Sequence, residues 1–280
     1  MVLGTDLTGK MAVVTGAGGI LCGMFARTLA RAGAAVALLD INLEAAEETA
    51  RDIREAGGTA AAYGVDVMDK EMLESVHARV LARLGPCDIL INGAGGNQAR
   101  ANTSKEYFEM GDIEADVATF FDMEYKGVQG VLDLNFLGGF LTCQVFAKDM
   151  VGREGCNIIN ISSASAARPP TRIPVYSGAV AALSNFTQWL AVHFAKAGIR
   201  VNAIAPGFFV TRQNEGLLYE EDGKPAARTA KVLAATPMGR FGRPEELNGA
   251  LMFLLNNEAA GFITGIILPV DGGFSAYSGV

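Results

Sequence analysis

The sequence has few of the residues that carry much enzyme chemistry. Its 280 residues include two histidines, four cysteines and one tryptophan. His77 and His193 both lie in helical patterns, and no cysteine has CxxC spacing or a histidine at metal-ligand spacing. We therefore expect no metal site, no catalytic histidine, and free structural thiols at Cys22, Cys87, Cys143 and Cys156.

Clusters of one charge and long apolar runs are also missing. Lys and Arg total 23 against 30 Asp and Glu, a net charge of −7, and no basic run argues for nucleic acid or an anionic membrane as partner. Apolar stretches are of strand length or are interrupted by charge, and Met1 to Lys10 is too polar for a signal peptide. We expect a soluble, cytoplasmic protein with neither nucleic-acid nor membrane partners.

Short apolar runs alternate with helical periodicities along the whole chain, which is typical of a parallel sheet wrapped by helices. The expected strands are Met11–Thr15, Ala35–Asp40, Ala60–Gly64, Ile89–Asn92, Asn157–Ser162, Arg200–Ala205 and Gly265–Val270. The expected helices are Ile20–Ala32, Leu43–Ala56, Lys70–Leu84, Tyr125–Met150, Val175–Ala197 and Pro244–Leu254. The sequence predicts a single α/β domain over residues 1–280, with a doubly wound (Rossmann-type) parallel sheet of about seven strands flanked by helices.

Two segments fit neither a strand nor a helix, Asn97–Met123 and Phe208–Phe241. Both follow strands at their carboxyl ends, which form the edge of an open α/β sheet where ligands bind. We therefore predict a pocket insertion over residues 97–123 and a substrate lid over residues 208–241.

A glycine-rich turn, TGAGGILCG over Thr15–Gly23, joins the first expected strand to the first helix. Such turns let the backbone approach a pyrophosphate and present helix N-terminal amides to it. Asp40 ends the next strand, where a carboxylate accepts a hydrogen bond from the adenosine ribose 2′-hydroxyl and repels a 2′-phosphate. Together these features predict a dinucleotide site that prefers NAD to NADP.

Ser163 ends an apolar strand run, and Tyr176 opens a helix thirteen positions later. This arrangement resembles the catalytic core of the short-chain dehydrogenase/reductase family, which continues as Tyr-x-x-x-Lys. Positions 176 and 180 are one helical turn apart, so their side chains share a face. Val180 occupies the position of the family's lysine.

The resemblance assigns a role to each residue of this core. In the family the tyrosine hydroxyl exchanges a proton with the substrate oxygen, the serine orients that oxygen, and the lysine lowers the tyrosine pKa and binds the nicotinamide ribose. An ammonium ~4–6 Å away lowers the pKa of a phenol by roughly 1–3 units. Val180 supplies no charge, so the resemblance implies a hydride-transfer site that is impaired.

Further motifs follow in the family's order over practically the whole chain. They are the turn after the fourth strand, an asparagine in the following long helix, a PGxxxT loop and the run Asp271–Gly273. Ile20 and Cys22 replace glycines of the family's TGxxxGxG turn, and Gly93 replaces the second Asn of its NNAG turn. The resemblance implies catalytic Asn135, Ser163 and Tyr176, and cofactor contacts at Gly16, Gly18, Gly19, Ile20, Leu21, Asp40, Asp66, Val67, Asn92, Ala94, Gly95, Pro206, Gly207 and Thr211.

The variable parts resemble the branch of this family described as D-mannonate oxidoreductases, or fructuronate reductases. The similar parts are the GGILCG turn, the AGGN run, the PGFF loop and the ending GFSAYSGV. A sugar acid carries a carboxylate that needs a cation in a partly desolvated pocket, and arginine binds it in bidentate fashion. The expected substrate-binding residues are Asn97, Arg168, Arg172 and Arg212.

Two functions stay open at this stage. One is an NAD-dependent oxidoreductase for mannonate and fructuronate, or for another polyol or sugar acid. The other is an NAD(H)-binding protein that has lost hydride transfer and serves as a sensor or partner subunit. Asn135, Ser163 and Tyr176 favour the enzyme.

The family also commonly forms homotetramers through helix pairs that match Tyr125–Met150 and Val175–Ala197. The second of these carries an apolar stripe wider than one contact with a sheet requires. Core packing alone would also explain the stripe, but we expect a homotetramer. The stripe consists of Phe186, Trp189, Leu190 and Phe194.

Overall fold

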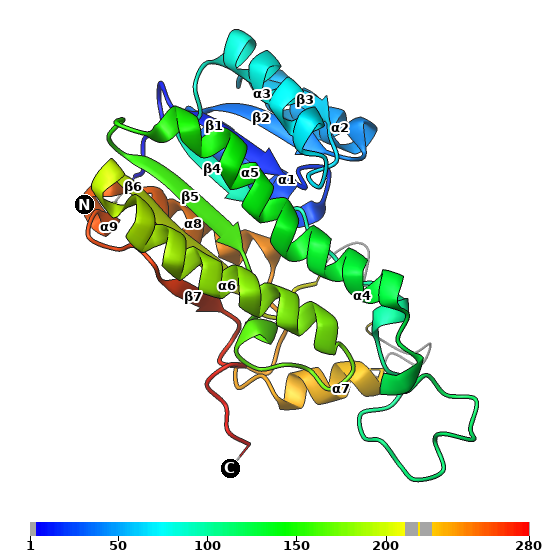
Figure 1. Cartoon of the computed structure of the whole chain (residues 1–280). Coiled ribbons are helices and arrows are strands. Elements are labelled where there is room, and N and C mark those ends of the chain that lie inside the picture. The colour runs from blue at the N-terminus through cyan, green and yellow to red at the C-terminus, as the bar shows by residue number, and fades with distance from the viewer. Residues whose placement is uncertain (1–3, 211–217, 219–225, 280) are drawn as a thin grey trace.

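The structure is a computed structural model that describes residues 4–210, 218 and 226–279. Among these residues seven parallel strands form one sheet in the order β3-β2-β1-β4-β5-β6-β7 (Figure 1). The strand order reverses between β1 and β4, which opens a crevice at the carboxyl ends of the strands. The strands are β1 (Met11–Thr15), β2 (Ala35–Asp40), β3 (Ala60–Gly64), β4 (Ile89–Asn92), β5 (Cys156–Ile161), β6 (Ile199–Pro206) and β7 (Ile267–Val270).

Helices cover both faces of the sheet, which is why the strands between them are almost continuously apolar. One core lies between the sheet and helices α3, α5 and α6, and a second lies between the sheet and α1, α2 and α8. This architecture confirms the predicted fold. The helices are α1 (Ile20–Arg31), α2 (Leu43–Glu55), α3 (Lys70–Leu84), α4 (Tyr125–Leu132), α5 (Gly138–Phe146), α6 (Pro174–Phe194), α7 (Ala227–Ala234), α8 (Leu247–Leu255) and α9 (Asn257–Ala260).

Four of the seven strands and helix α3 have the predicted bounds, and the other predicted elements differ at their ends. The strand expected from Gly265 begins at Ile267, because Gly265 has a positive φ of 81° that interrupts extended backbone. The helix expected over Pro244–Leu254 starts as the 3₁₀ turn η8 (Pro244–Glu246). The helix expected over Val175–Ala197 starts at Pro174 and ends in a further 3₁₀ turn, η6 (Ala195–Ala197).

The long helix expected over Tyr125–Met150 is interrupted. Helices α4 and α5 are joined by a π-helical turn, η3 (Asp133–Leu137), and the run ends in the 3₁₀ turn η4 (Ala147–Met150). Inside the π turn, the side-chain amide of Asn135 donates to the carbonyl oxygen of Val131 at 2.8 Å. A side chain inserted into the helical hydrogen-bond ladder accounts for the local widening. The prediction of one regular helix was therefore wrong at the position of Asn135.

The same helical run, Tyr125–Met150, is the one candidate among the described residues that is long and apolar enough to cross a membrane. In that run 44% of the apolar window is buried in the protein. A helix that packs against a sheet needs the same composition, so this finding is weak evidence for a membrane span.

The two segments without expected elements are partly ordered into short helices. The insertion contains the 3₁₀ turns η1 (Ala99–Ala101) and η2 (Phe120–Asp122), and its tip projects from the body of the protein (Figure 1). The segment predicted as a lid contains α7, a helix that the sequence analysis missed. Residues 211–217 and 219–225 of that segment lie outside the described residues.

Candidate active site

A groove of about 540 Å³ opens over the carboxyl ends of β1 to β4, at the point where the strand order reverses. The first glycine-rich turn, the end of β2 and the turn after β4 form its walls. Ten of the residues predicted to contact the cofactor line it, namely Gly16, Gly18, Gly19, Ile20, Leu21, Asp40, Asp66, Val67, Ala94 and Gly95.

The glycines of the first turn are required by close approach of the backbone. Gly16 has a φ of 68°, and a Cβ there would lie 2.9 Å from the Cα atom of Ala94. A Cβ at Gly18 would lie 2.8 Å from that of Ala45. The turn therefore packs directly on its neighbours while its amides lead into the N-terminus of α1. These features fit a dinucleotide whose pyrophosphate lies at that N-terminus.

The carboxylate of Asp40 lies in the wall of the groove, as predicted. One oxygen accepts a hydrogen bond from the amide of Gly18 at 2.9 Å, and the other accepts from the amide of Asn42 at 2.8 Å. These two bonds fix the position of the carboxylate beside the glycine turn. A ribose 2′-hydroxyl in the groove would find an oriented acceptor there.

Two departures from the family motifs compensate for one another. A Cβ at Gly93 would lie 2.1 Å from the sulfur of Cys22, so any larger residue at 93 would overlap that thiol. Cys22 is buried, and burial raises the pKa of its thiol to about 12. The thiol is thus a packing group that fills space left by Gly93. The hydroxyl of Thr15 accepts from the amides of Gly93 and Ala94 and holds the second turn against the first.

Four predicted cofactor residues do not line the groove. Asn92 is buried beneath it and donates to the sulfur of Cys143 and to the side-chain oxygen of Asn160. Pro206 ends β6, and Gly207 follows it in contact with Asp271. The fourth residue, Thr211, lies outside the described residues.

The predicted catalytic pair is brought together at the start of α6. The hydroxyl of Tyr176 is hydrogen-bonded to Ser163, which follows β5. The Ser163 oxygen also accepts from the amide of Ser165 at 3.1 Å, so its position is fixed by the backbone. Burial raises the pKa of Tyr176 above its usual value, and the hydrogen bond from Ser163 lowers it by less.

Val180 lies one turn further along α6 and is only 2% exposed. Its carbonyl oxygen accepts from the hydroxyls of Ser162 and Ser184, and its side chain belongs to the interior. The position where the family has an ammonium is therefore apolar in this chain. The pKa of Tyr176 is shifted upward, which is the direction opposite to that required of a general base.

Asn135 is 5% exposed and clamps the turn after β4. Its amide nitrogen donates to the carbonyl oxygen of Gly96 at 2.7 Å, and its oxygen accepts from the amide of Gly96 at 3.0 Å. A Cβ at Gly95 would lie 2.7 Å from that same oxygen. The sequence analysis assigned Asn135 to the catalytic residues. Its contacts in the structure hold the turn after β4, which forms one wall of the groove.

A second pocket, of about 640 Å³, contains Tyr176. The turn after β4 contributes Gly95 to the groove and Asn97 to this pocket, so the two cavities lie on either side of that turn. Arg172 also lines the pocket, and its Nε donates to the carbonyl oxygen of Thr103 at 3.2 Å. Asn97 and Arg172 thus lie where the sequence analysis expected them.

The other two predicted substrate residues are not brought into this pocket. Arg168 is half-buried on a turn after β5 and is absent from the pocket lining among the described residues. Arg212 lies outside the described residues.

Three charged residues of the pocket were missed by the sequence analysis. Arg228 and Lys231 come from α7, and Glu106 comes from the insertion. The ammonium of Lys231 donates to a carboxylate oxygen of Glu106 at 2.5 Å. The sequence did contain a signal for the two basic residues: Arg228 and Lys231 are three positions apart in the expected lid, a spacing that places both on one face of a helix.

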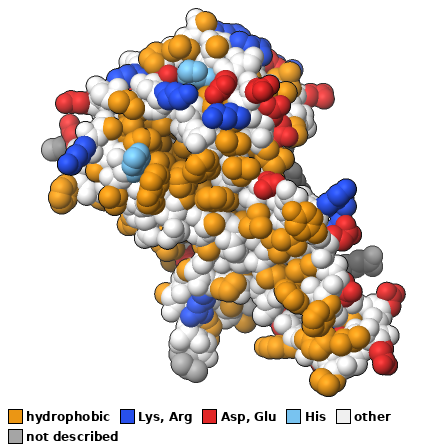
Figure 2. Space-filling view, in the orientation of Figure 1, with side chains coloured by type: hydrophobic (Ala, Val, Ile, Leu, Met, Phe, Trp, Pro, Cys, Tyr) orange, Lys and Arg blue, Asp and Glu red, His pale blue; other side chains and the backbone are white. Residues whose placement is uncertain are grey.

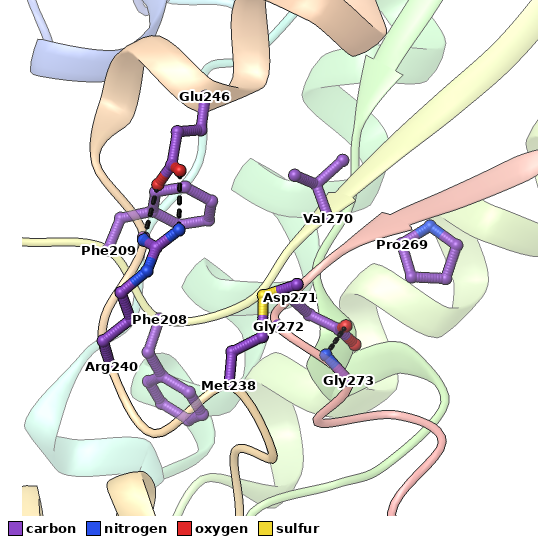
Figure 3. A pocket seen from close by; sticks show the side chains of 11 residues that line it. Phe208, Phe209, Met238, Arg240, Glu246, Pro269, Val270, Asp271, Gly272 and Gly273 are labelled. Atoms are coloured by element: carbon purple, nitrogen blue, oxygen red, sulfur yellow. Dashed lines mark hydrogen bonds and ion pairs between the residues drawn. The ribbon is translucent and has the colours of Figure 1, made fainter.

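A smaller cavity, of about 380 Å³, lies between the loop after β6 and the end of β7. Figure 3 shows Arg240 and Glu246 facing each other on one wall, joined by hydrogen bonds of 2.8 and 2.7 Å. On the other wall Asp271 accepts from the amide of Gly273 at 2.9 Å. Phe208 lines both this cavity and the pocket of Tyr176. Arg240 and Glu246 pair with each other, and the carboxylate of Asp271 is held by the amides of Gly273 and Ser275. These contacts fix the loop that bounds the active site.

Comparison with known proteins agrees with this geometry. Residues 19–275 match the family model described as enoyl-(acyl carrier protein) reductase. The chain is 54% identical to an uncharacterised oxidoreductase of Haemophilus influenzae, covering 98% of this chain and 96% of that protein. It is 34% identical to a cis-4-hydroxycyclohexanecarboxylate dehydrogenase of Sinomonas cyclohexanicum, covering 98% and 100%.

A crystal structure from Haemophilus influenzae, which contains bound NAD, has the same fold. It is named for an assumed D-mannonate oxidoreductase activity, is 53% identical, covers 98% of both chains and superposes with a TM-score of 0.95. The family match spans most of the chain, and the groove, the Ser163–Tyr176 pair and the sheet order agree with it. The chain therefore belongs to the short-chain dehydrogenase/reductase family of oxidoreductases.

Proposed function

We propose that this protein is an NAD-dependent oxidoreductase that interconverts the alcohol and ketone forms of a sugar acid of the D-mannonate/D-fructuronate type. The observation that carries the proposal is Tyr176, hydrogen-bonded to Ser163, in a pocket that three cationic side chains also line, beside a groove that fits a dinucleotide. Two relatives support it: the one crystallised with NAD, and the one named for a substrate that has both a hydroxyl and a carboxylate.

Each residue has a defined task in this proposal. The glycine turn at Gly16 and Gly18 holds the pyrophosphate, and Asp40 accepts from the adenosine ribose. The nicotinamide, when bound, supplies or accepts the hydride. Ser163 holds the substrate oxygen, and the Tyr176 hydroxyl gives it a proton during reduction or removes one during oxidation. Arg172 neutralises the substrate carboxylate.

The upward pKa shift of Tyr176 favours the reducing direction. Reduction uses the protonated phenol, which is the dominant form near neutral pH. Oxidation needs the phenolate, and an unassisted phenol of pKa ~10 is ionised in only about one molecule per thousand at pH 7. Val180 therefore slows oxidation more than reduction.

The test is an assay of NADH oxidation with D-fructuronate, with Tyr176→Phe as control. Slow turnover that is lost in the control supports the enzyme. NADH binding without turnover in the parent protein, and no turnover in Val180→Lys, would favour the alternative of a nucleotide-binding sensor or partner subunit.

A homotetramer in the cytoplasm also remains our proposal. Figure 2 shows hydrophobic side chains gathered over α5 and α6. Trp189 is 56% exposed and Val192 80% exposed there, although the stripe residues Phe186 and Leu190 are buried. Phe194 is half-buried and packs against the same core, so three of the four stripe residues serve the core. Trp189, together with its exposed neighbour Val192, is what remains available to a second copy of the chain. A monomeric mass in light scattering at micromolar concentration would contradict the tetramer.

A further inference from the structure

An ion pair joins two walls of the pocket that contains Tyr176. One wall is the insertion and the other is α7. Glu106 from the insertion accepts from Lys231 of α7 at 2.5 Å, and both residues line the pocket. The side chain of Lys231 is 66% exposed and that of Glu106 is 32% exposed. Such an exposed pair contributes little to the stability of a fold. Lys231 can therefore change its partner at small cost.

The other charged residues of the pocket indicate that the new partner of Lys231 would be an anion. Arg172 lies in the loop before α6, and Arg228 lies one turn before Lys231 on α7. With Glu106 as the one acidic residue of the described lining, the pocket carries three positive charges and one negative charge. The carboxylate of Glu106 already makes with Lys231 the contact that the carboxylate of a ligand would make.

We propose that Lys231 binds the carboxylate of the acid substrate together with Arg172, and that Glu106 competes with the substrate for Lys231. Binding of an acid replaces the Glu106–Lys231 pair with a substrate–Lys231 pair, and Glu106 turns outward. This inference rests on the proposed function, since it requires an anionic substrate in this pocket.

A purely structural role for the pair predicts the opposite result. If Glu106 and Lys231 served only to hold the insertion against α7, loss of the pair would loosen the pocket and weaken binding of every ligand. If they exchange, removal of the Glu106 charge frees Lys231 and tightens binding of acids alone. The sign of the effect of Glu106→Gln therefore separates the two roles.

The experiment titrates D-mannonate into the protein–NADH complex and follows NADH fluorescence. An alcohol cannot react with the reduced cofactor, so the reading does not depend on turnover or on Val180. Glu106→Gln should bind D-mannonate about fivefold more tightly, while D-mannitol, which lacks the carboxylate, binds unchanged. Glu109→Gln is the matched control, because Glu109 pairs with Lys105 in the same insertion and does not line the pocket.

A second variant tests whether Glu106 acts through Lys231. Lys231→Met should weaken D-mannonate binding about tenfold, and in its background Glu106→Gln should gain less than about twofold, because no cation then holds Glu106 in the pocket. A gain that stays fivefold in that background, or weaker binding by Glu106→Gln alone, would overturn the exchange. NADH affinity checks that each variant is folded.

A second acid, cis-4-hydroxycyclohexanecarboxylate, separates this inference from the proposed function. If only this acid binds, and binds more tightly to Glu106→Gln, the exchange stands and the sugar-acid assignment is wrong. If both acids bind the parent and Glu106→Gln equally, the exchange is wrong and the sugar-acid function stands. If neither acid binds any variant, both are wrong.

Discussion

The cofactor groove and the substrate pocket lie side by side but are built from different parts of the chain. The groove is formed by backbone and small residues in close contact, where a Cβ at Gly16 or Gly18 would meet another atom within 2.9 Å. The substrate pocket is lined by charged side chains from the insertion and α7, and the ion pair seen among its described residues, Glu106–Lys231, is partly exposed. The groove therefore has one geometry fixed by packing, whereas the pocket is defined by charges that can change partners.

Tyr176 lies where these two regions meet, and there the chain departs most from its family. Its hydrogen bond with Ser163 is in place, but position 180 is a buried valine. The binding regions on both sides thus fit a substrate and a cofactor, while the proton-transfer group between them lacks its cation. Substitutions in the groove, in the pocket and at Val180 should therefore affect different measured properties.

The largest effect is expected at the junction. Val180→Lys places an ammonium one helical turn from Tyr176, which should lower the pKa of the phenol and raise the rate of D-mannonate oxidation at pH 7 about 100-fold. The measurement is kcat for NAD reduction across a pH series. In the parent protein the raised pKa keeps the phenol protonated, so oxidation should still increase with pH near pH 10, whereas in Val180→Lys it should level off at lower pH.

Reduction is the internal control for this variant. It uses the protonated phenol, so Val180→Lys should change its rate at pH 7 much less than that of oxidation. Equal gains in both directions would mean that the lysine acts by binding the ribose rather than by lowering the pKa of Tyr176.

The next effect is confined to the substrate pocket. Arg172→Ala should weaken D-mannonate binding by ~1.5–3 kcal/mol, the worth of a charge-assisted hydrogen bond, and leave NADH affinity intact. Titration of the NADH complex measures both. Arg168→Ala is the matched control, because that residue is on the same loop but outside the described pocket lining, and it should have no effect. A loss of NADH affinity in Arg172→Ala would show that the pocket and the groove do not bind their ligands independently.

A third change tests the packing of the groove. Gly93→Asn brings a side chain against the sulfur of Cys22, where even a Cβ would be 2.1 Å away, and should lower the free energy of unfolding by about 2 kcal/mol. The double variant with Cys22→Gly, which restores both family residues, should recover most of that loss. Chemical denaturation of the two single variants and the double variant measures the coupling. Additive effects would show that the two departures are independent.

The difference between the groove and the pocket also explains which parts of the structure could be predicted from the sequence. The strands and the glycine turn were predictable because buried periodicity and close backbone approach leave local marks, as in β1 and at Gly16 and Asp40. The reciprocal fit of Cys22 and Gly93 was not, since it joins turns that are distant in the chain. Helix α7 was missed because it is short and half-exposed, and with it went Lys231, whose partner Glu106 lies in an insertion without periodicity.

The smallest effect concerns the choice of cofactor. Asp40→Asn keeps an oxygen that can accept from the amide of Gly18 but removes the negative charge. NADPH should then bind about tenfold more tightly, because its 2′-phosphate no longer meets a like charge, while NADH affinity changes little. Fluorescence titration with both cofactors measures the ratio. Asp40→Ala adds the loss of the hydrogen bond that fixes the glycine turn, so it should weaken NADH as well. Comparable dissociation constants for NADH and NADPH in the parent protein would show that Asp40 does not select the cofactor, and the groove would then recognise the dinucleotide by its backbone alone.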